Sequence, residues 1–297
     1  MSTRKKALLA VIIGNSIFGF SFLFSKTALE MTLPSVMLAV RFTTAFIALN
    51  LIVLFGKITG KISFSLKGKP LKYVLLLAVF QPVIYFCAES YGIAYTSSAF
   101  AGTIIAVIPI VGIIFDVVIL KTKVSVKQII CSIASVLGVA IATLGAENMK
   151  SSTIGVMLLL VAVVAGALFY VFSKKAGGFF SPLERTYVMF GVGSVTYVTF
   201  ALVECQGQYE SLILPAVTSL EFWGCILYLA VISSVVAFLI LNYGSSYVSV
   251  SEASLFANLT TVISIAAGIL IVHEAFNLQQ IIGAVIIIGS VYIATSF

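Results

Sequence analysis

Charged residues are scarce in this chain of 297 residues, and their scarcity excludes most water-soluble folds. Asp, Glu, Lys and Arg together make up 9% of the sequence, whereas a typical globular domain carries about 25%. So few charges cannot cover a surface that faces water, and 61% of the residues are hydrophobic. We therefore expect lipid to be the main solvent of the protein.

Residue patterns that carry catalysis or bind metals are also missing. The chain has one histidine, and its four cysteines show no metal-ligand spacing. The motifs His-Glu-x-x-His, Gly-x-Ser-x-Gly and Gly-x-x-x-x-Gly-Lys-Ser/Thr do not occur in the sequence. We therefore expect no enzyme activity, no ATP hydrolysis, no metal site and no cofactor.

Long hydrophobic runs are what the chain has in abundance. A helix needs about 20 mainly apolar residues to cross about 30 Å of hydrocarbon, and these runs lack the apolar–polar alternation of membrane strands. The sequence therefore predicts an all-α polytopic membrane protein with ten transmembrane helices. Their approximate ranges are 7–28, 34–56, 71–95, 98–120, 126–145, 153–173, 182–203, 221–243, 249–272 and 277–296.

The basic residues indicate an orientation rather than a nucleic-acid partner. The net charge is +7, but lysine and arginine are scattered between apolar segments and form no single basic face. They are concentrated at residues 4–6 and in the loops at 57–72, 121–127 and 174–175, whereas glutamates collect in the alternate loops. By the positive-inside rule, both termini are expected in the cytoplasm.

The sequence contains a two-fold internal repeat. Phe-Ser-Lys at 24–26 recurs at 172–174, and Tyr-Gly-x-x-Tyr at 91–95 recurs at 243–247. We expect two repeats of five helices each, with a boundary after residue 148, so that 1–148 and 149–297 form one transport domain. Because five is odd, the second repeat should lie inverted in the membrane. Inverted repeats are typical of transporters that alternate access to a central site.

Short motifs in both repeats carry a resemblance to a known family. In the first repeat they are Gly-Phe-Ser-Phe at 19–22, Pro34 and Arg-Phe-Thr-Thr-Ala at 41–45; in the second they include His-Glu at 273–274 and the segment 278–284. The chain resembles the drug/metabolite transporter superfamily, EamA type. The resemblance implies export or import of small organic metabolites, including amino acids.

Two ionisable residues lie deep inside predicted helices, where a charge costs at least about 2.5–3.5 kcal/mol. At 1.5 Å per residue, Arg41 and Glu89 lie about 10 Å and about 9 Å from the outer ends of their helices. Their equal depth predicts an Arg41–Glu89 ion pair. Two interpretations stay open: a buried structural pair, or a proton or cation site at Glu89 that Arg41 tunes.

Polar residues at helical spacing extend this candidate site. Gln81, Tyr85 and Glu89 share one helical face, which either lines a transport path or packs against a neighbouring helix. Pro82 within the same segment is expected to kink the helix. In the second repeat, the counterparts of Tyr85 and Glu89 are Ala237 and Leu241. Residues that differ between the repeats are expected to recognise substrate. The other predicted cavity residues are Asn15, Gly19, Phe22, Thr103, Tyr170 and Asn258.

Three further ionisable residues lie near predicted helix ends. Asp116 and Glu252 are expected to reach water or the lysines of nearby loops. His273 is expected to be a solvated turn residue.

These features predict a secondary active transporter of small organic metabolites, such as amino acids or related amphipathic or cationic solutes. Alternating access, proton coupling through Glu89 and export are the expected mode of action. A gradient-driven facilitator and an uptake permease of the same fold remain alternatives. The expected partners are a small-molecule substrate and membrane lipid, without nucleic acid. We expect a monomer or weak homodimer in a bacterial cytoplasmic membrane.

Overall fold

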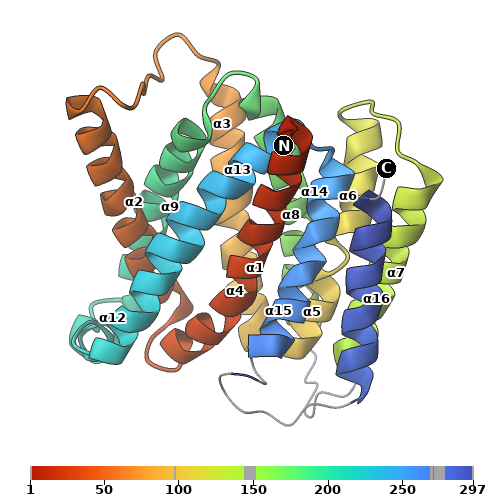
Figure 1. Cartoon of the computed structure of the whole chain (residues 1–297). Coiled ribbons are helices and arrows are strands. Elements are labelled where there is room, and N and C mark those ends of the chain that lie inside the picture. The colour runs from red at the N-terminus through yellow and green to blue at the C-terminus, as the bar shows by residue number, and fades with distance from the viewer. Residues whose placement is uncertain (1, 97, 144–151, 268–269, 271–277, 296–297) are drawn as a thin grey trace.

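The computed structural model of the protein describes residues 2–96, 98–143, 152–267, 270 and 278–295. Most of these residues are helical and none of them forms a strand (Figure 1). In this part of the chain, nine helical segments are long and apolar enough to cross a membrane, and one shorter apolar helix follows them. The predicted all-α, multi-pass architecture is therefore confirmed.

The first five segments precede the predicted repeat boundary, which itself lies outside the described residues. Three of the five are single helices and two are interrupted. They are α1 (Thr3–Leu29), α2 (Pro34–Ile58), α3 (Leu71–Ala78) with η1 (Val79–Ile84) and α4 (Tyr85–Tyr95), α5 (Ser98–Ile105) with α6 (Ile108–Val118), and α7 (Val126–Thr143).

The second five segments repeat this order, including the positions of the interruptions. They are α8 (Thr153–Gly177), α9 (Pro182–Cys205), α12 (Leu220–Leu227) with η2 (Tyr228–Val236) and α13 (Ala237–Tyr247), α14 (Val250–Leu255) with η3 (Phe256–Asn258) and α15 (Leu259–Ala267), and α16 (Leu278–Thr295). Two short helices that no predicted span covers, α10 (Tyr209–Leu212) and α11 (Leu214–Val217), connect α9 to α12.

Local sequence explains where several of these helices begin. Pro34 and Pro182, equivalent in the repeat, occupy the first turns of α2 and α9. Proline suits this position because its φ is helical and its missing N–H has no partner there anyway. Ser181 and Glu184 form a capping box that satisfies free backbone amides at the start of α9.

The third segment of each repeat is broken at the same depth. Gln81 has φ −147° and ψ 120°, outside the helical region, directly before Pro82. The predicted kink at Pro82 is therefore confirmed. The equivalent η2 is also π-helical, although Ser233 and Ser234 replace Gln81 and Pro82 there. Both repeats thus bring irregular backbone to the middle of the bundle.

The two repeats pack around each other in a symmetric pattern. Helix α2 packs against its own counterpart α9, and α7 packs against its counterpart α16. Helix α1 packs against α13, as α8 packs against α4. Both termini lie at one end of the molecule (Figure 1), which we call the terminal face. With four membrane segments between them, α1 and α8 run in opposite directions, so the second repeat is inverted.

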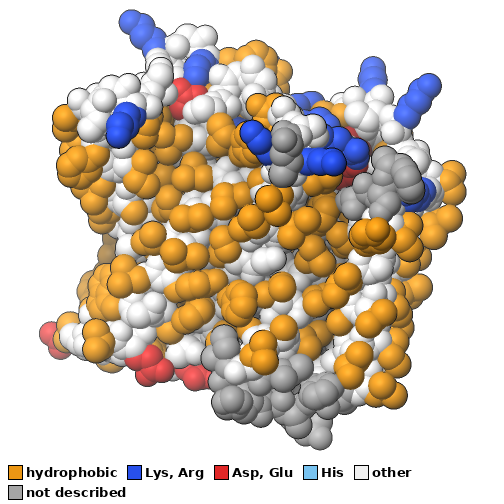
Figure 2. Space-filling view, viewed as in Figure 1, with side chains coloured by type: hydrophobic (Ala, Val, Ile, Leu, Met, Phe, Trp, Pro, Cys, Tyr) orange, Lys and Arg blue, Asp and Glu red, His pale blue; other side chains and the backbone are white. Residues whose placement is uncertain are grey.

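Charges gather at the two ends of the molecule. In Figure 2, lysine and arginine side chains with a few acidic ones lie along the terminal face, acidic side chains mark the opposite end, and a broad apolar band separates the two ends. This band is the surface expected to contact lipid. The assignment of the terminal face to the cytoplasm remains a prediction from the positive-inside rule.

Glycines allow α7 and α16 to pack closely. A Cβ atom on Gly283 would overlap the carbonyl oxygen of Gly138 and approach Ala142 Cβ to 2.5 Å. At Gly289, on the same helix, a Cβ atom would meet nothing within 4 Å. The two glycines therefore differ in packing while sharing a helix.

We predict that Gly283→Ala lowers the thermal unfolding midpoint of the detergent-purified protein, because overpacking costs about 1–3 kcal/mol. The matched control, Gly289→Ala, should leave the midpoint unchanged or raise it, since alanine favours helix by up to about 1 kcal/mol. Equal midpoints for the two variants would contradict the close α7–α16 contact.

Candidate functional site

A cavity of about 140 Å³ lies at the centre of the bundle and is lined by residues from both repeats. Its lining combines apolar side chains, such as Phe18, Ile105 and Ile108, with a minority of polar groups. The polar lining residues are Asn15, Ser21, Ser25, Arg41, Gln81, Tyr85, Glu89, Ser90, Tyr170, Asn258, Thr260 and Thr261. A mainly apolar pocket with a few polar groups is the usual form of a small-molecule site.

The cavity extends from the middle of the bundle toward the end opposite the terminal face. Its lining on α1 runs from Asn15 to Leu29, near the end of that helix, and its lining on α4 reaches Ile93. Helices α13 and α14, which occupy the terminal half of their segments, contribute no lining residue within the described chain.

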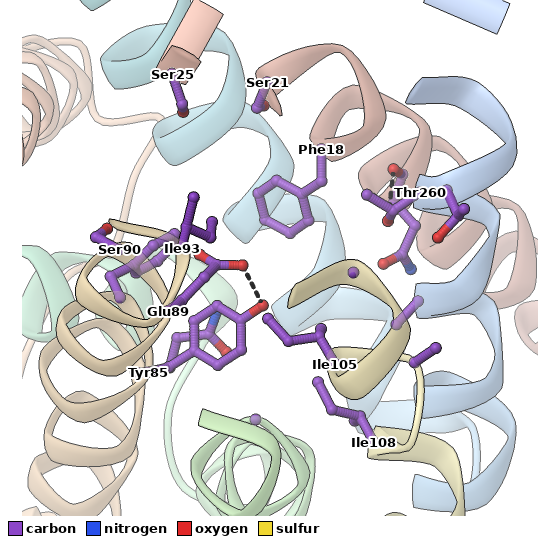
Figure 3. A pocket seen from close by; sticks show the side chains of 18 of the residues that line it. Phe18, Ser21, Ser25, Tyr85, Glu89, Ser90, Ile93, Ile105, Ile108 and Thr260 are labelled. Atoms are coloured by element: carbon purple, nitrogen blue, oxygen red, sulfur yellow. Dashed lines mark hydrogen bonds between the residues drawn. The ribbon is translucent and has the colours of Figure 1, made fainter. Parts of the chain in front are cut away.

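Glu89 is the one carboxylate among the described lining residues. Its side chain is buried, with 9% exposure, and Tyr85 Oη donates a hydrogen bond of 2.8 Å to Glu89 Oε1 from one turn earlier (Figure 3). The second carboxylate oxygen accepts no hydrogen bond from the described residues. Figure 3 shows Phe18 and Thr260 on the other side of the same space.

Arg41 lines the same cavity and is 3% exposed. Its Nε atom donates to Ser234 Oγ at 3.0 Å, and its Nη2 atom donates to Ser233 Oγ at 3.1 Å. The guanidinium carbon lies 4.8 Å from the ring centre of Phe86. An arginine of the first repeat is thus held by two hydroxyl groups from η2 of the second.

The predicted Arg41–Glu89 ion pair is wrong. Within the described chain, ion pairs join Arg4 to Glu252 and Lys69 to Glu184, whereas Glu89 bonds to Tyr85 and Arg41 bonds to serines. Equal depth placed the two charges at one level of the bundle, but each makes its hydrogen bonds to neutral neighbours instead of to the other. Both charged groups therefore remain available to a ligand in the cavity.

Four other predicted residues also line the cavity: Asn15, Gln81, Tyr170 and Asn258. Asn15 Nδ2 donates to the carbonyl oxygen of Val11 at 2.8 Å. Asn258 Nδ2 donates to Ser135 Oγ at 3.0 Å and thereby contacts α7. The amide oxygens of Asn15 and Asn258 accept no hydrogen bond from the described residues and can serve a ligand.

Two predicted residues lie elsewhere, and one cannot be placed. A Cβ atom on Gly19 would lie 2.9 Å from the carbonyl oxygen of Thr260, so this glycine permits close packing of α1 on α15. The hydroxyl group of Thr103 lies 2.5 Å from that of Thr143, away from the cavity. The side chain of Phe22 lies outside the described part of the structure.

Sequence reasoning missed two groups of serines at the site. Ser21 and Ser25 follow Phe18 at helical spacing on α1, and this spacing could have revealed their shared face. Ser233 and Ser234 occupy the repeat positions of Gln81 and Pro82. Aligning the repeats could have placed them at the depth of the cavity, although not beside Arg41.

Polar contacts tie helices together at the terminal face. Arg4 on α1 forms an ion pair of 2.5 Å with Glu252, which also caps α14 with Ser249. Asp116 is fully buried and accepts hydrogen bonds from Thr122 Oγ1 at 2.6 Å and from the backbone N–H of Ser251 at 3.1 Å. The expectation that Asp116 and Glu252 reach water or loop lysines is therefore wrong. His273 lies outside the described residues.

Arg185 is a second buried arginine, with 0% exposure, which sequence reasoning did not single out. It donates to the carbonyl oxygen of Ser173 at 2.6 Å, to Ser246 Oγ at 2.7 Å and to the carbonyl oxygen of Asn242. These bonds join α8, α9 and α13 near the terminal face. Arg185 lines no part of the central cavity.

Comparison with known proteins identifies the family. Residues 5–144 and 153–296 match the model of the EamA-like transporter family. The chain is 33% identical over 290 residues to the uncharacterized transporter YcxC of Bacillus subtilis (strain 168), covering 96% of this chain and 91% of that protein. It is 24% identical over 292 residues to an uncharacterized transporter of Archaeoglobus fulgidus, covering 98% of each.

The fold is also found among solved structures. One crystal structure superposes with a TM-score of 0.80 at 16% sequence identity, and the match covers 98% of this chain and 96% of that chain. At this identity the likeness establishes the fold alone.

We predict that Asp116→Ala destabilises the protein by about 1–3 kcal/mol, because it leaves the buried N–H of Ser251 without an acceptor. Thermal or denaturant unfolding of the detergent-purified protein measures the loss. The exposed Glu210→Ala serves as the control and should unfold as the native protein does. An unchanged midpoint for Asp116→Ala would show that the hydrogen bond between Asp116 and Ser251 contributes nothing to stability.

Proposed function

The chain belongs to the EamA-like transporter family, and on this premise we propose that it is a secondary active transporter of small organic metabolites. The carrying observation is the central cavity, in which a buried carboxylate and a buried guanidinium face a mainly apolar space between inverted repeats. Such a cavity suits a small amphipathic solute, since its apolar part is enclosed while its charged groups find partners.

Alternating access would proceed by separating helices at the terminal face. The cavity extends toward the opposite end, while Arg4–Glu252 and Asp116–Ser251 hold α14 to α1 and α6 at the terminal face. If the terminal face is cytoplasmic, this conformation faces outward. Release of these contacts, with closure at the other end, would expose the same cavity to the cytoplasm.

Glu89 is the proposed coupling residue. A negative charge at this depth is costly without a counterion, so either a proton or a cationic group of the substrate would neutralise it. Because the proton and the substrate compete for the same carboxylate, binding of one releases the other, and the transporter exchanges protons for substrate. A proton that reaches Glu89 from outside would displace substrate outward, which favours export. A facilitator or uptake permease of the same fold is the alternative, in which proton and substrate movement are not exchanged.

The remaining parts of the proposal concern the surroundings of the protein. The apolar band of its surface supports lipid as the main contact. A bacterial cytoplasmic membrane is the proposed location, and a monomer or weak homodimer is the proposed assembly.

We predict that an imposed pH gradient accelerates flux of radiolabelled amino acids into proteoliposomes several-fold, and that Glu89→Gln abolishes this response. Glutamine keeps the size of the side chain but cannot exchange a proton. The exposed Glu221→Gln is the control and should respond as the native protein does. If flux through the native protein does not change with the pH gradient, the protein is a facilitator. If Glu89→Gln still responds to the gradient, Glu89 is not the coupling site.

A further inference from the structure

Arg41 presents an unused edge to the cavity. Its Nε and Nη2 atoms are engaged by Ser234 and Ser233, whereas the N–H groups of Nη1 have no acceptor among the described residues. Among the described residues, the polar side-chain atoms that are fully enclosed by protein and lack a hydrogen-bond partner are Ser132 Oγ, Arg185 Nε and Ser245 Oγ. Arg41 Nη1 is not one of them, so it is not fully enclosed. The free edge therefore opens to the cavity that Arg41 lines.

Arg185 is a useful comparison, because it is a buried arginine whose hydrogen bonds join helices away from the cavity. Two of its acceptors are backbone carbonyl oxygens, it joins its own helix α9 to α8 and α13, and it borders no part of the cavity. Arg41 has two serine hydroxyls instead. Ser233 Oγ also accepts a hydrogen bond of 2.7 Å from Ser21, and neither serine carries a charge that could balance the guanidinium. A buried guanidinium without an anion is costly, which leaves Arg41 suited to bind one.

We propose that Arg41 is the anion-binding residue of the cavity: it holds the carboxylate of a zwitterionic substrate, whose ammonium group contacts Glu89. This inference rests on the proposed transport function and narrows its substrate class. The cavity carries one positive and one negative group that do not pair with each other. A cationic ligand would leave Arg41 without a counterion, and an anionic ligand would leave Glu89 without one unless it is protonated, whereas a zwitterion satisfies both.

Ser233 and Ser234 act as positioning residues in this arrangement. They fix the guanidinium so that its free edge points into the cavity, and the rings of Phe42 and Phe86 lie 5.5 Å and 4.8 Å from its central carbon. A fork of N–H groups held at a fixed angle matches the two oxygens of a carboxylate. Lysine would keep the charge at position 41 but would lose this match.

The test is a ligand screen by thermal shift on the purified full-length protein in detergent. The probes are the free L-amino acids, their carboxamides, which lack the carboxylate, and the corresponding deaminated acids, which lack the ammonium group. A ligand that binds the folded state raises its unfolding midpoint. We expect at least one free amino acid to stabilise the native protein, and both matched derivatives to bind about 10- to 100-fold more weakly.

Three variants assign the selectivity to Arg41. Arg41→Gln should abolish the preference for the free acid over its carboxamide, and Arg41→Lys should retain part of it. The double variant Ser233→Ala, Ser234→Ala should weaken binding of the free acid while leaving position 41 intact. Lys57→Gln, an exposed change on the same helix, is the control. A residue that only joined helices would alter the midpoint without ligand but not this preference.

The outcomes separate the two proposals. If no free amino acid stabilises the native protein, or if carboxamides bind as well as the acids, the anion-binding role of Arg41 is overturned. Saturable flux of other labelled metabolites into proteoliposomes would then still support transport. If no labelled solute, amino acids included, shows saturable flux, the transport proposal itself fails.

Discussion

The cost of an unsatisfied polar group in lipid governs this structure. Within an apolar bundle, each backbone amide must bond inside its own helix, and each buried charge must find a neighbour. Most of the chain meets this requirement by forming long apolar helices. Several exceptions lie in the middle of the bundle: the break at Gln81 and Pro82, the π-helical η2, and the charged side chains of Arg41 and Glu89. Arg41, Gln81 and Glu89 all line the cavity, so the charges and the broken backbone at Gln81 border this space rather than lipid.

The repeat supplies a frame, and the differences between its copies supply the chemistry. The contacts between helices are symmetric: α2 packs against α9, and α1 packs against α13 in the same way as α8 packs against α4. These contacts place equivalent segments around the cavity. The polar groups are not equivalent: Glu89 corresponds to Leu241, and Arg41 corresponds to Met189. A symmetric frame can therefore present one carboxylate and one guanidinium to a ligand that is itself asymmetric.

Hydrophobic length predicted the membrane-spanning segments, and Pro82 predicted a break in the third. The matching distortion in η2 could not be predicted, since no proline marks it. Charge in an apolar span singled out Arg41 and Glu89, but sequence position gives only depth along a helix. The direction in which each side chain points depends on the neighbouring helices. For that reason the expected ion pair was wrong, and Gly19 and Thr103 face packing partners instead of the cavity.

The hydrogen bond between Arg41 and Ser233 joins residues that are 192 positions apart, which has a consequence for biogenesis. At about 5–20 residues per second, the ribosome would make Ser233 about 10 to 40 s after Arg41. During this interval the second helix enters the membrane with a guanidinium whose final partners do not yet exist. The nascent chain must hold that charge near water, at the translocon or at a headgroup, until the eighth segment arrives.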